Sequence, residues 1–249
     1  MHKILVLVGL GVCLSVPATA QEEWTEYRNV QDGFHALFPG QPTVTETTWE
    51  SQAGFILPER VYAVERGSER YSVRVIDYTG VEQMGIERTE QCPAGAAPCL
   101  GGAISGVGYW KHDVRGAPIY ALGSFLRRGA QIADMFWNQL DLVSGVMVQM
   151  VNSDQSRSFV YVAMHEMRLY VSEGRVPNQR PYPGIFTQSV GWLDDEGRSV
   201  RYRNMYNHEI HGLREAPVPG YNADGRPVGG GGNGSAQGGT PPPGNDQQR

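Results

Sequence analysis

Several histidines of this 249-residue sequence are candidate metal ligands, judged by their spacing and their neighbours. His208 and His211 are three residues apart, so a helix would bring both imidazoles near one ion. Zinc takes three or four protein ligands, however, and this pair supplies only two. His165 and Glu166 begin like the zincin motif, but Leu169 stands where its second histidine belongs. We therefore interpret both places as polar strand ends or turns and predict no metal there.

A calcium-like pattern begins at Asn152 and continues with Asp154 and Ser156, which match the first three ligand positions of a calcium loop. Such a loop also requires glycine at its sixth position and glutamate at its twelfth. Arg157 and Ala163 occupy those positions. A polar turn between two strands is the better interpretation, and we predict no cofactor for the chain.

Covalent catalysis has no support in the sequence. The segment 102–106 contains a serine between glycines, but its spacing differs from that of a nucleophile elbow. A Ser-x-x-Lys pair is also absent, because Gly108 stands three residues before Lys111. A hydrolase would therefore need groups dispersed along the chain and assembled by the fold. The candidates for such a site are His112, Asp113 and His165.

The net charge and the composition of the chain bear on which ligands it could bind. The net charge of −5 argues against a nucleic-acid-binding protein, because such proteins bind phosphates through clustered cations. Arg198, Arg201 and Arg203 could bind an anion, but we favour a solvated face balanced by the acids of residues 194–196. The 12 Tyr and 5 Trp suit either a sheet core, which we favour, or an interaction cleft.

The first twenty residues have the three parts of a secretory signal peptide. His2 and Lys3 form a basic start, an apolar run covers residues 4–16, and small residues precede a cleavage site after Ala20. The run is too short to span a bilayer, which argues against a membrane anchor. No later stretch has the length of a transmembrane segment. The sequence therefore predicts export, to the periplasm or the exterior.

Export bears on the two cysteines that remain after cleavage, Cys92 and Cys99. They flank a segment of small residues and prolines, and in an oxidising compartment two nearby thiols are expected to pair. A redox-active pair is the alternative, but its cysteines are usually separated by two residues at a helix start. We predict a structural disulfide, which contributes roughly 2–3 kcal/mol for so short a loop.

The C-terminal segment differs in composition from the rest of the chain. Of residues 216–249, 16 are glycine or proline, and few are apolar. Such a segment cannot bury enough surface to offset the entropy of ordering, so we predict a disordered tail. No comparable linker interrupts residues 21–215, which we predict to form a single domain after the signal peptide of residues 1–20.

Alternation of apolar and polar residues predicts several strands in that domain. In one of them, Tyr71, Val73 and Val75 are expected to face the core, with Ser72 and Arg74 facing outward. Helices are predicted to begin at Pro118 and at Pro183. The predicted strands cover residues 34–38, 61–65, 71–78, 131–137, 146–151, 159–164, 169–172 and 199–205. This order indicates an α+β fold, an antiparallel sheet covered by helices.

Short blocks of the sequence resemble a family of uncharacterised secreted proteobacterial proteins. The blocks are Trp24…Tyr27…Asp32-Gly33-Phe34…Phe38-Pro39-Gly40…Pro42, Tyr71-Ser72-Val73…Asp77-Tyr78, His112-Asp113-Val114-Arg115-Gly116-Ala117 and Arg168-Leu169-Tyr170…Val176-Pro177…Phe186…Gln188-Ser189…Asp194…Gly197…Arg201-Tyr202. The element order also resembles the Mog1/PsbP-like α/β fold. That resemblance implies a binding or assembly protein and carries over no site residues, because a fold does not transfer a partner.

These observations favour an exported binding or accessory module without a catalytic motif, whose partner is an unknown protein or small molecule of the cell envelope. An envelope hydrolase with a dispersed site is the first alternative. The second is a small-molecule carrier with an aromatic pocket between helix and sheet.

Overall fold

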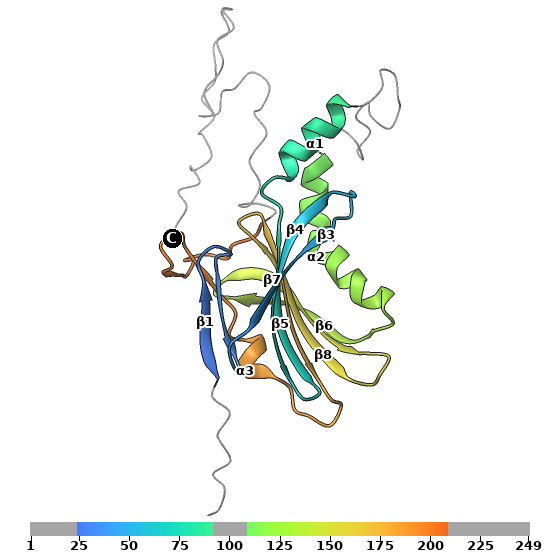
Figure 1. Cartoon of the computed structure of the whole chain (residues 1–249), viewed down its shortest axis with the longest axis vertical. Helices are drawn as coiled ribbons and strands as arrows, with labels where there is room; N and C mark the ends of the chain where they lie inside the picture. The colour runs from blue at the N-terminus through green and yellow to red at the C-terminus, as the bar shows by residue number, and fades with distance from the viewer. Residues whose placement is uncertain (1–23, 92–108, 209–249) are drawn as a thin grey trace, which may run out of the picture.

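The main sheet contains seven strands, and each is antiparallel to its neighbours. The computed structural model describes residues 24–91 and 109–208 (Figure 1). Across the sheet the strand order is β3-β4-β5-β9-β8-β7-β6, so β3 and β6 form its two edges. The strands are β3 (Thr43–Glu50), β4 (Ile56–Arg66), β5 (Glu69–Asp77), β6 (Gln131–Leu140), β7 (Val143–Val151), β8 (Arg157–His165) and β9 (Arg168–Val176).

Helices cover one face of this sheet. The long helix α2 (Tyr109–Arg127) packs on β8 and β9, and α1 (Val81–Glu90) packs against α2. The side chains between α2 and the sheet are almost all aliphatic or aromatic, so their burial from water stabilises the layer. They include Trp110, Val114, Ala121, Phe125, Val148, Val160, Val162, Leu169 and Val171.

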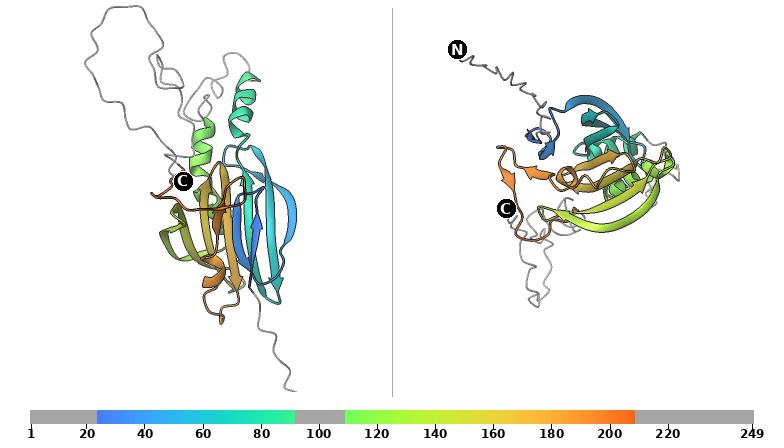
Figure 2. Two further views of the ribbon diagram at one scale, coloured as in Figure 1. Left: turned by 90° about the vertical axis from the view of Figure 1, so that its left-hand side faces the viewer. Right: turned by 90° about the horizontal axis from the view of Figure 1, so that it is seen from below.

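A smaller sheet and a short helix cover the opposite face (Figure 2). The small sheet has the order β1-β2-β10-β11 and forms a second core with the main sheet. Aromatic rings dominate this core, among them Phe34, Phe38, Tyr170, Phe186 and Trp192. The elements are β1 (Thr25–Asn29), β2 (Phe34–Phe38), α3 (Gly184–Thr187), β10 (Gly191–Leu193) and β11 (Ser199–Val200).

The strands predicted from alternation are confirmed for residues 34–38, 61–65, 131–137, 146–151, 159–164 and 169–172, and all but the first are longer than predicted. The strand predicted over 71–78 is observed as β5, which ends at Asp77. The strand predicted over 199–205 is observed only as Ser199–Val200.

The prediction that a helix begins at Pro118 is wrong. The helix begins nine residues earlier, at Tyr109, and Pro118 lies buried in its interior. Proline has no N–H to donate to the carbonyl group of Val114, yet the helix continues past it. Trp110, Val114 and Ala121 share its buried face, and this packing outweighs the missing hydrogen bond.

The predicted outward face of β5 is also wrong, because both faces of the main sheet are covered. Ser72 is 2% exposed, and Arg74 lies on the helix-covered side, where it pairs with Glu59 and stacks on Trp49. For the same reason, the expectation of a sheet covered by helices holds for one face only. Two antiparallel sheets dominate the described residues.

Gly145 in β7 marks a close approach between two strands. A Cβ added there would lie 2.5 Å from Cε2 of Tyr161 and 2.6 Å from the carbonyl oxygen of Val162. We expect Gly145→Ala to lower the free energy of unfolding by about 1–3 kcal/mol, the usual cost of overpacking. Gly80→Ala is the control, since a Cβ at Gly80 has no atom within 4 Å. Urea denaturation of both variants checks the prediction, and equal stabilities would contradict it.

Candidate functional site

The structure separates the three residues of the dispersed hydrolase site. Asp113 lies on α2 and contacts the loop before β4, on the helix-covered face of the sheet. His165 ends β8 and packs into the aromatic core on the opposite face. His112 is exposed on α2. The main sheet therefore lies between the two buried groups, and these residues form no common site.

His165 instead belongs to a buried aromatic cluster. It is 1% exposed, and its ring centroid lies 4.6 Å from that of Trp192 and 4.9 Å from that of Tyr206. Its Nε2 atom is 2.6 Å from the hydroxyl oxygen of Tyr202. The predicted tight turn after it is confirmed, with Glu166 at a positive φ. Among the described residues there is no group of three or more histidine, cysteine or acidic side chains that could hold a metal ion.

The calcium-like pattern is the turn between β7 and β8, as predicted. The carboxylate of Asp154 accepts hydrogen bonds from the backbone and the hydroxyl group of Ser156, at 3.1 and 2.6 Å, and pairs with Arg175. The bonds from Ser156, together with Arg175, lower the pKa of Asp154 to about 2. The hydrogen bonds and the ion pair of the Asp154 carboxylate are therefore provided by Ser156 and Arg175.

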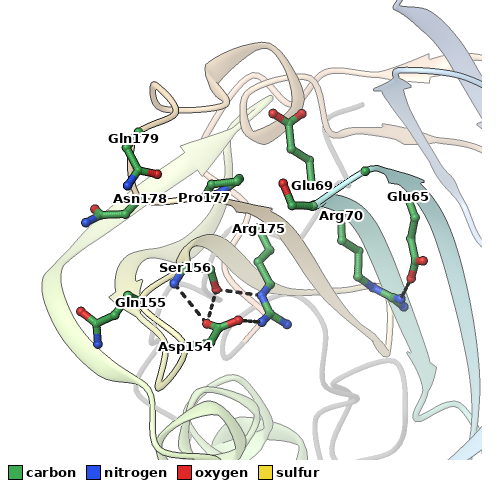
Figure 3. A pocket seen from close by; sticks show the side chains of 12 residues that line it. Glu65, Glu69, Arg70, Asp154, Gln155, Ser156, Arg175, Pro177, Asn178 and Gln179 are labelled. Carbon is green, nitrogen blue, oxygen red and sulfur yellow. Dashed lines mark hydrogen bonds and ion pairs between the residues drawn. The ribbon is translucent and has the colours of Figure 1, made fainter.

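This turn borders a groove of about 560 Å³ at one end of the main sheet (Figure 3). The groove lies between the β4–β5 hairpin, the β7–β8 turn and the end of β9. Ion pairs line or border it, joining Arg70 to Glu65, Arg175 to Asp154 and Arg180 to Glu69. Exposed pairs of this kind contribute about 0–1 kcal/mol each, and their charges neutralise one another. The groove therefore has the character of a solvated surface.

Asp113 is the buried acid of the helix-covered face. It is 2% exposed, its Oδ1 accepts a hydrogen bond of 3.1 Å from the Ala53 N–H, and its Oδ2 has no hydrogen-bond partner among the described residues. Burial raises the pKa of Asp113, while hydrogen bonds from Ser51 and Ala53 oppose that shift. A carboxylic acid whose folded pKa is raised holds its proton more tightly in the folded than in the unfolded protein.

Asp113 should therefore make stability fall as pH rises from the ordinary aspartate pKa through the raised one, and its contribution is most favourable at low pH. We expect Asp113→Asn to remove this decline, because the amide keeps an acceptor for Ala53 and does not ionise. Urea denaturation at pH 4, 6 and 8 measures the slope. The exposed Asp195→Asn should retain the wild-type slope. Parallel curves for wild type and Asp113→Asn would contradict this assignment.

The edge strand β6 exposes large apolar side chains. Ile132, Met135, Phe136 and Trp137 are 44%, 55%, 44% and 78% exposed, although β6 is part of the main sheet. Such side chains normally lie in a core, and contiguous exposed ones mark interaction sites. The opposite edge, β3, reads Thr-Val-Thr-Glu-Thr-Thr-Trp-Glu and has the charged and polar character that protects an edge.

The exposed side chains of β6 lie on both of its faces. Met135 and Trp137 pair with Val148 and Val146, whose side chains face the helix-covered core. Directly paired residues of antiparallel strands share a face, so Met135 and Trp137 point to the α2 side. Phe136 points to the other side with its partner Met147.

Further large apolar side chains are exposed on α2 and near the end of the described chain. Ile119 and Leu126 of α2 are 62% and 45% exposed. At the other end of β6, Trp137 and Met205 line a shallow groove, and Met205 is 52% exposed. We call Ile119, Leu126, Ile132, Met135, Phe136, Trp137 and Met205 the β6 surface.

The strand over 131–137 is predictable from the sequence, but its position at the edge of the sheet is not. Its run Met-Phe-Trp is typical of a buried strand. Nothing in the sequence indicates that this strand has a neighbour on one side only. The aromatic side chains were expected in the core. This is correct for Tyr62, Tyr161, Tyr170 and Trp192 and wrong for Trp137.

Several other sequence predictions lie outside the described residues: the signal peptide, the pairing of Cys92 with Cys99, the tail and His211 of the histidine pair. Of the predicted arginine face, Arg198 pairs with Asp194 and Glu196, as expected for a solvated surface. No helix in the described part of the chain combines the length and hydropathy needed to cross a membrane.

Comparisons with known proteins give similarity to solved structures but no family. No family model and no curated protein matches the chain. Among solved structures, the solution structure of cyanobacterial PsbP (CyanoP) from Synechocystis is similar with a TM-score of 0.39 and 15% sequence identity. The match covers 74% of this chain and 99% of that chain. A similarity of this size transfers neither a partner nor a function.

Proposed function

We propose that the chain is an exported binding or accessory module that holds another polypeptide of the cell envelope on its β6 surface. The observation that carries this proposal is the exposure of Trp137, 78%, on an edge strand whose apolar neighbours are also exposed. Tryptophan is the side chain most enriched among the residues that dominate protein interfaces. Export is supported by the tripartite pattern of residues 1–20.

Leaving this apolar surface in contact with water is unfavourable in free energy. Apolar surface contributes roughly 25 cal/mol for each Å² that is removed from water, so a partner that covers Trp137 and Met135 gains several kcal/mol. Those side chains contribute little to folding, because they are largely exposed in the folded protein. Binding is a role that accounts for their presence.

A capture experiment tests the proposal. The mature protein is immobilised as wild type, Trp137→Ser and the control Ile185→Ser, whose isoleucine is 57% exposed on α3, away from β6. From a cell-envelope extract we expect wild type and Ile185→Ser to enrich the same polypeptide. Trp137→Ser should lose it by about tenfold or more. Folding is expected to change by less than about 0.5 kcal/mol in either variant. Equal enrichment by all three proteins would contradict the proposal.

Export and the disulfide are tested by the intact mass of the protein isolated from the same fraction. We expect the mass of residues 21–249 less two hydrogen atoms. The mass of the complete chain would contradict cleavage after Ala20, and the two additional hydrogens would contradict the pairing of Cys92 with Cys99.

A further inference from the structure

We propose, on the basis of the function proposed above, that the bound polypeptide segment is an extended strand that adds to the outer edge of β6. In this arrangement alternate apolar side chains of the segment pack beside Met135 and Trp137, and a cationic side chain on its other face meets Asp134. The partner is thus recognised by a pattern, apolar and basic residues in alternation.

The backbone of β6 provides the first argument. The β6–β7 hairpin turns through two residues, Asp141 and Leu142, both at positive φ, so its closing pair Leu140–Val143 is hydrogen-bonded within the hairpin. Because N–H and C=O groups alternate in direction along an antiparallel strand, those of Gln139, Trp137 and Met135 point away from β7.

A hydrogen bond of Met135 agrees with this alternation. The N–H of Met135 donates to the carboxylate of its neighbour Asp134 at 2.9 Å, as an outward-pointing amide can. Among the described residues β6 has β7 as its only strand neighbour. The β-bulge between Ile132 and Asp134 limits regular pairing to residues 134–140.

The side chains provide the second argument. Met135 and Trp137 share the α2 side of the sheet, and both are exposed there. An added strand would place every second side chain beside them. On the other side of the sheet lies Asp134, which is the single charged residue of β6. None of the ion pairs formed by the described residues includes Asp134, so a cation on the incoming strand would complement it.

The size of the site favours a segment over a second folded copy of the chain. Even if Ile119, Leu126 and Met205 are counted with residues 134–139, about nine residues are exposed here, whereas a stable interface between folded proteins uses about 20–30 residues on each side. A lipid surface is disfavoured because hydrocarbon cannot satisfy the outward N–H and C=O groups of an open edge. A polypeptide strand satisfies both the backbone groups and the apolar side chains.

Synthetic peptides test the pattern directly. The probes are a fluorescently labelled decapeptide of alternating valine and lysine and its counterpart of alternating valine and glutamate, with binding followed by fluorescence anisotropy. We expect the lysine peptide to bind at least about tenfold more tightly than the glutamate peptide. Trp137→Ser should weaken its binding at least about tenfold, while Ile185→Ser leaves it unchanged. Asp134→Lys should reverse the preference between the two peptides.

N-methylation of the lysine peptide tests strand addition itself. Methylation of one alternate set of amides should abolish binding and methylation of the other should leave it intact, because only one set faces β6. The valine set faces β6 in antiparallel addition and the lysine set in parallel addition. If both methylated peptides bind like the parent, the peptide is held by charge alone and the strand model is overturned.

The remaining outcomes separate this inference from the proposed function. Captured envelope polypeptide that depends on Trp137, with no binding of either peptide, would overturn strand addition and leave the proposed function standing. A concentration-dependent dimer that Trp137→Ser dissociates would identify a second copy as the occupant and overturn the inference. Sedimentation with phosphatidylglycerol vesicles that Trp137→Ser abolishes, without peptide binding, would identify a lipid surface and contradict both proposals.

Discussion

Replacement of Arg60 by leucine is expected to lower the free energy of unfolding by about 3–5 kcal/mol, the cost of leaving a buried charge unpaired. Asp32 is fully buried in the turn between β1 and β2, and its carboxylate accepts a hydrogen bond from Arg60 Nε at 2.7 Å. The Arg60 NH2 group and the Tyr62 hydroxyl bind the same carboxylate. This cluster joins the small sheet to β4 of the main sheet.

Two comparison variants separate the charge from the packing. Tyr62→Phe removes one hydrogen bond to a charged group and should cost about 1.5–3 kcal/mol. The double variant Asp32→Asn, Arg60→Leu removes both charges and should be more stable than Arg60→Leu alone. Urea denaturation measures all three. If Arg60→Leu is as stable as wild type, Asp32 does not depend on this cation.

Replacement of Trp192 by alanine is expected to cost about 3–5 kcal/mol, typical of a large aromatic residue removed from a core. Trp192 is fully buried, and its ring centroid lies 4.9 Å from that of Tyr170 and 4.6 Å from that of His165. Its Nε1–H donates to the carbonyl oxygen of Leu140 at 2.9 Å, which fixes the end of β6 against the small sheet.

Trp192→Phe provides the control, because it keeps most of the ring contact and loses the bond to Leu140. We expect it to cost about 0.5–1.5 kcal/mol, the usual contribution of one hydrogen bond, because the Leu140 carbonyl group keeps its bond within the β6–β7 hairpin. Calorimetric or urea-induced unfolding of both variants gives the comparison. Equal losses for alanine and phenylalanine would show that the hydrogen bond, and not the packing of the indole ring, dominates.

Local patterns in the sequence predict most strands but not their neighbours. Alternation marks β2 and β5, and the polar turn at residues 152–156 separates β7 from β8, because these signals depend on adjacent residues. The strand β3 escapes prediction because its threonines and glutamates lack an apolar face. The helix start at Pro118 misleads because tertiary packing extends the helix past a residue that usually begins one.

The candidate surface depends on information that no local pattern contains. Trp137 lies in a strand that reads as buried, and only the strand order places β6 at an edge. The ion pair of Asp32 with Arg60 likewise joins residues far apart in the sequence, and no helix or strand periodicity predicts such a contact. The residues and their elements are therefore predictable from the sequence, but which of them are exposed to solvent depends on the strand order of the folded sheet.

The central claim, that β6 holds another polypeptide, is tested most directly by photo-crosslinking in the living cell. A benzophenone side chain replaces Trp137 in one protein and Ile185 in a control. We expect the label at 137 to yield one discrete adduct with a second envelope polypeptide and the label at 185 to yield none. The same adduct from both positions, adducts only with lipid, or an adduct confined to the chain's own residues 209–249 would contradict the account.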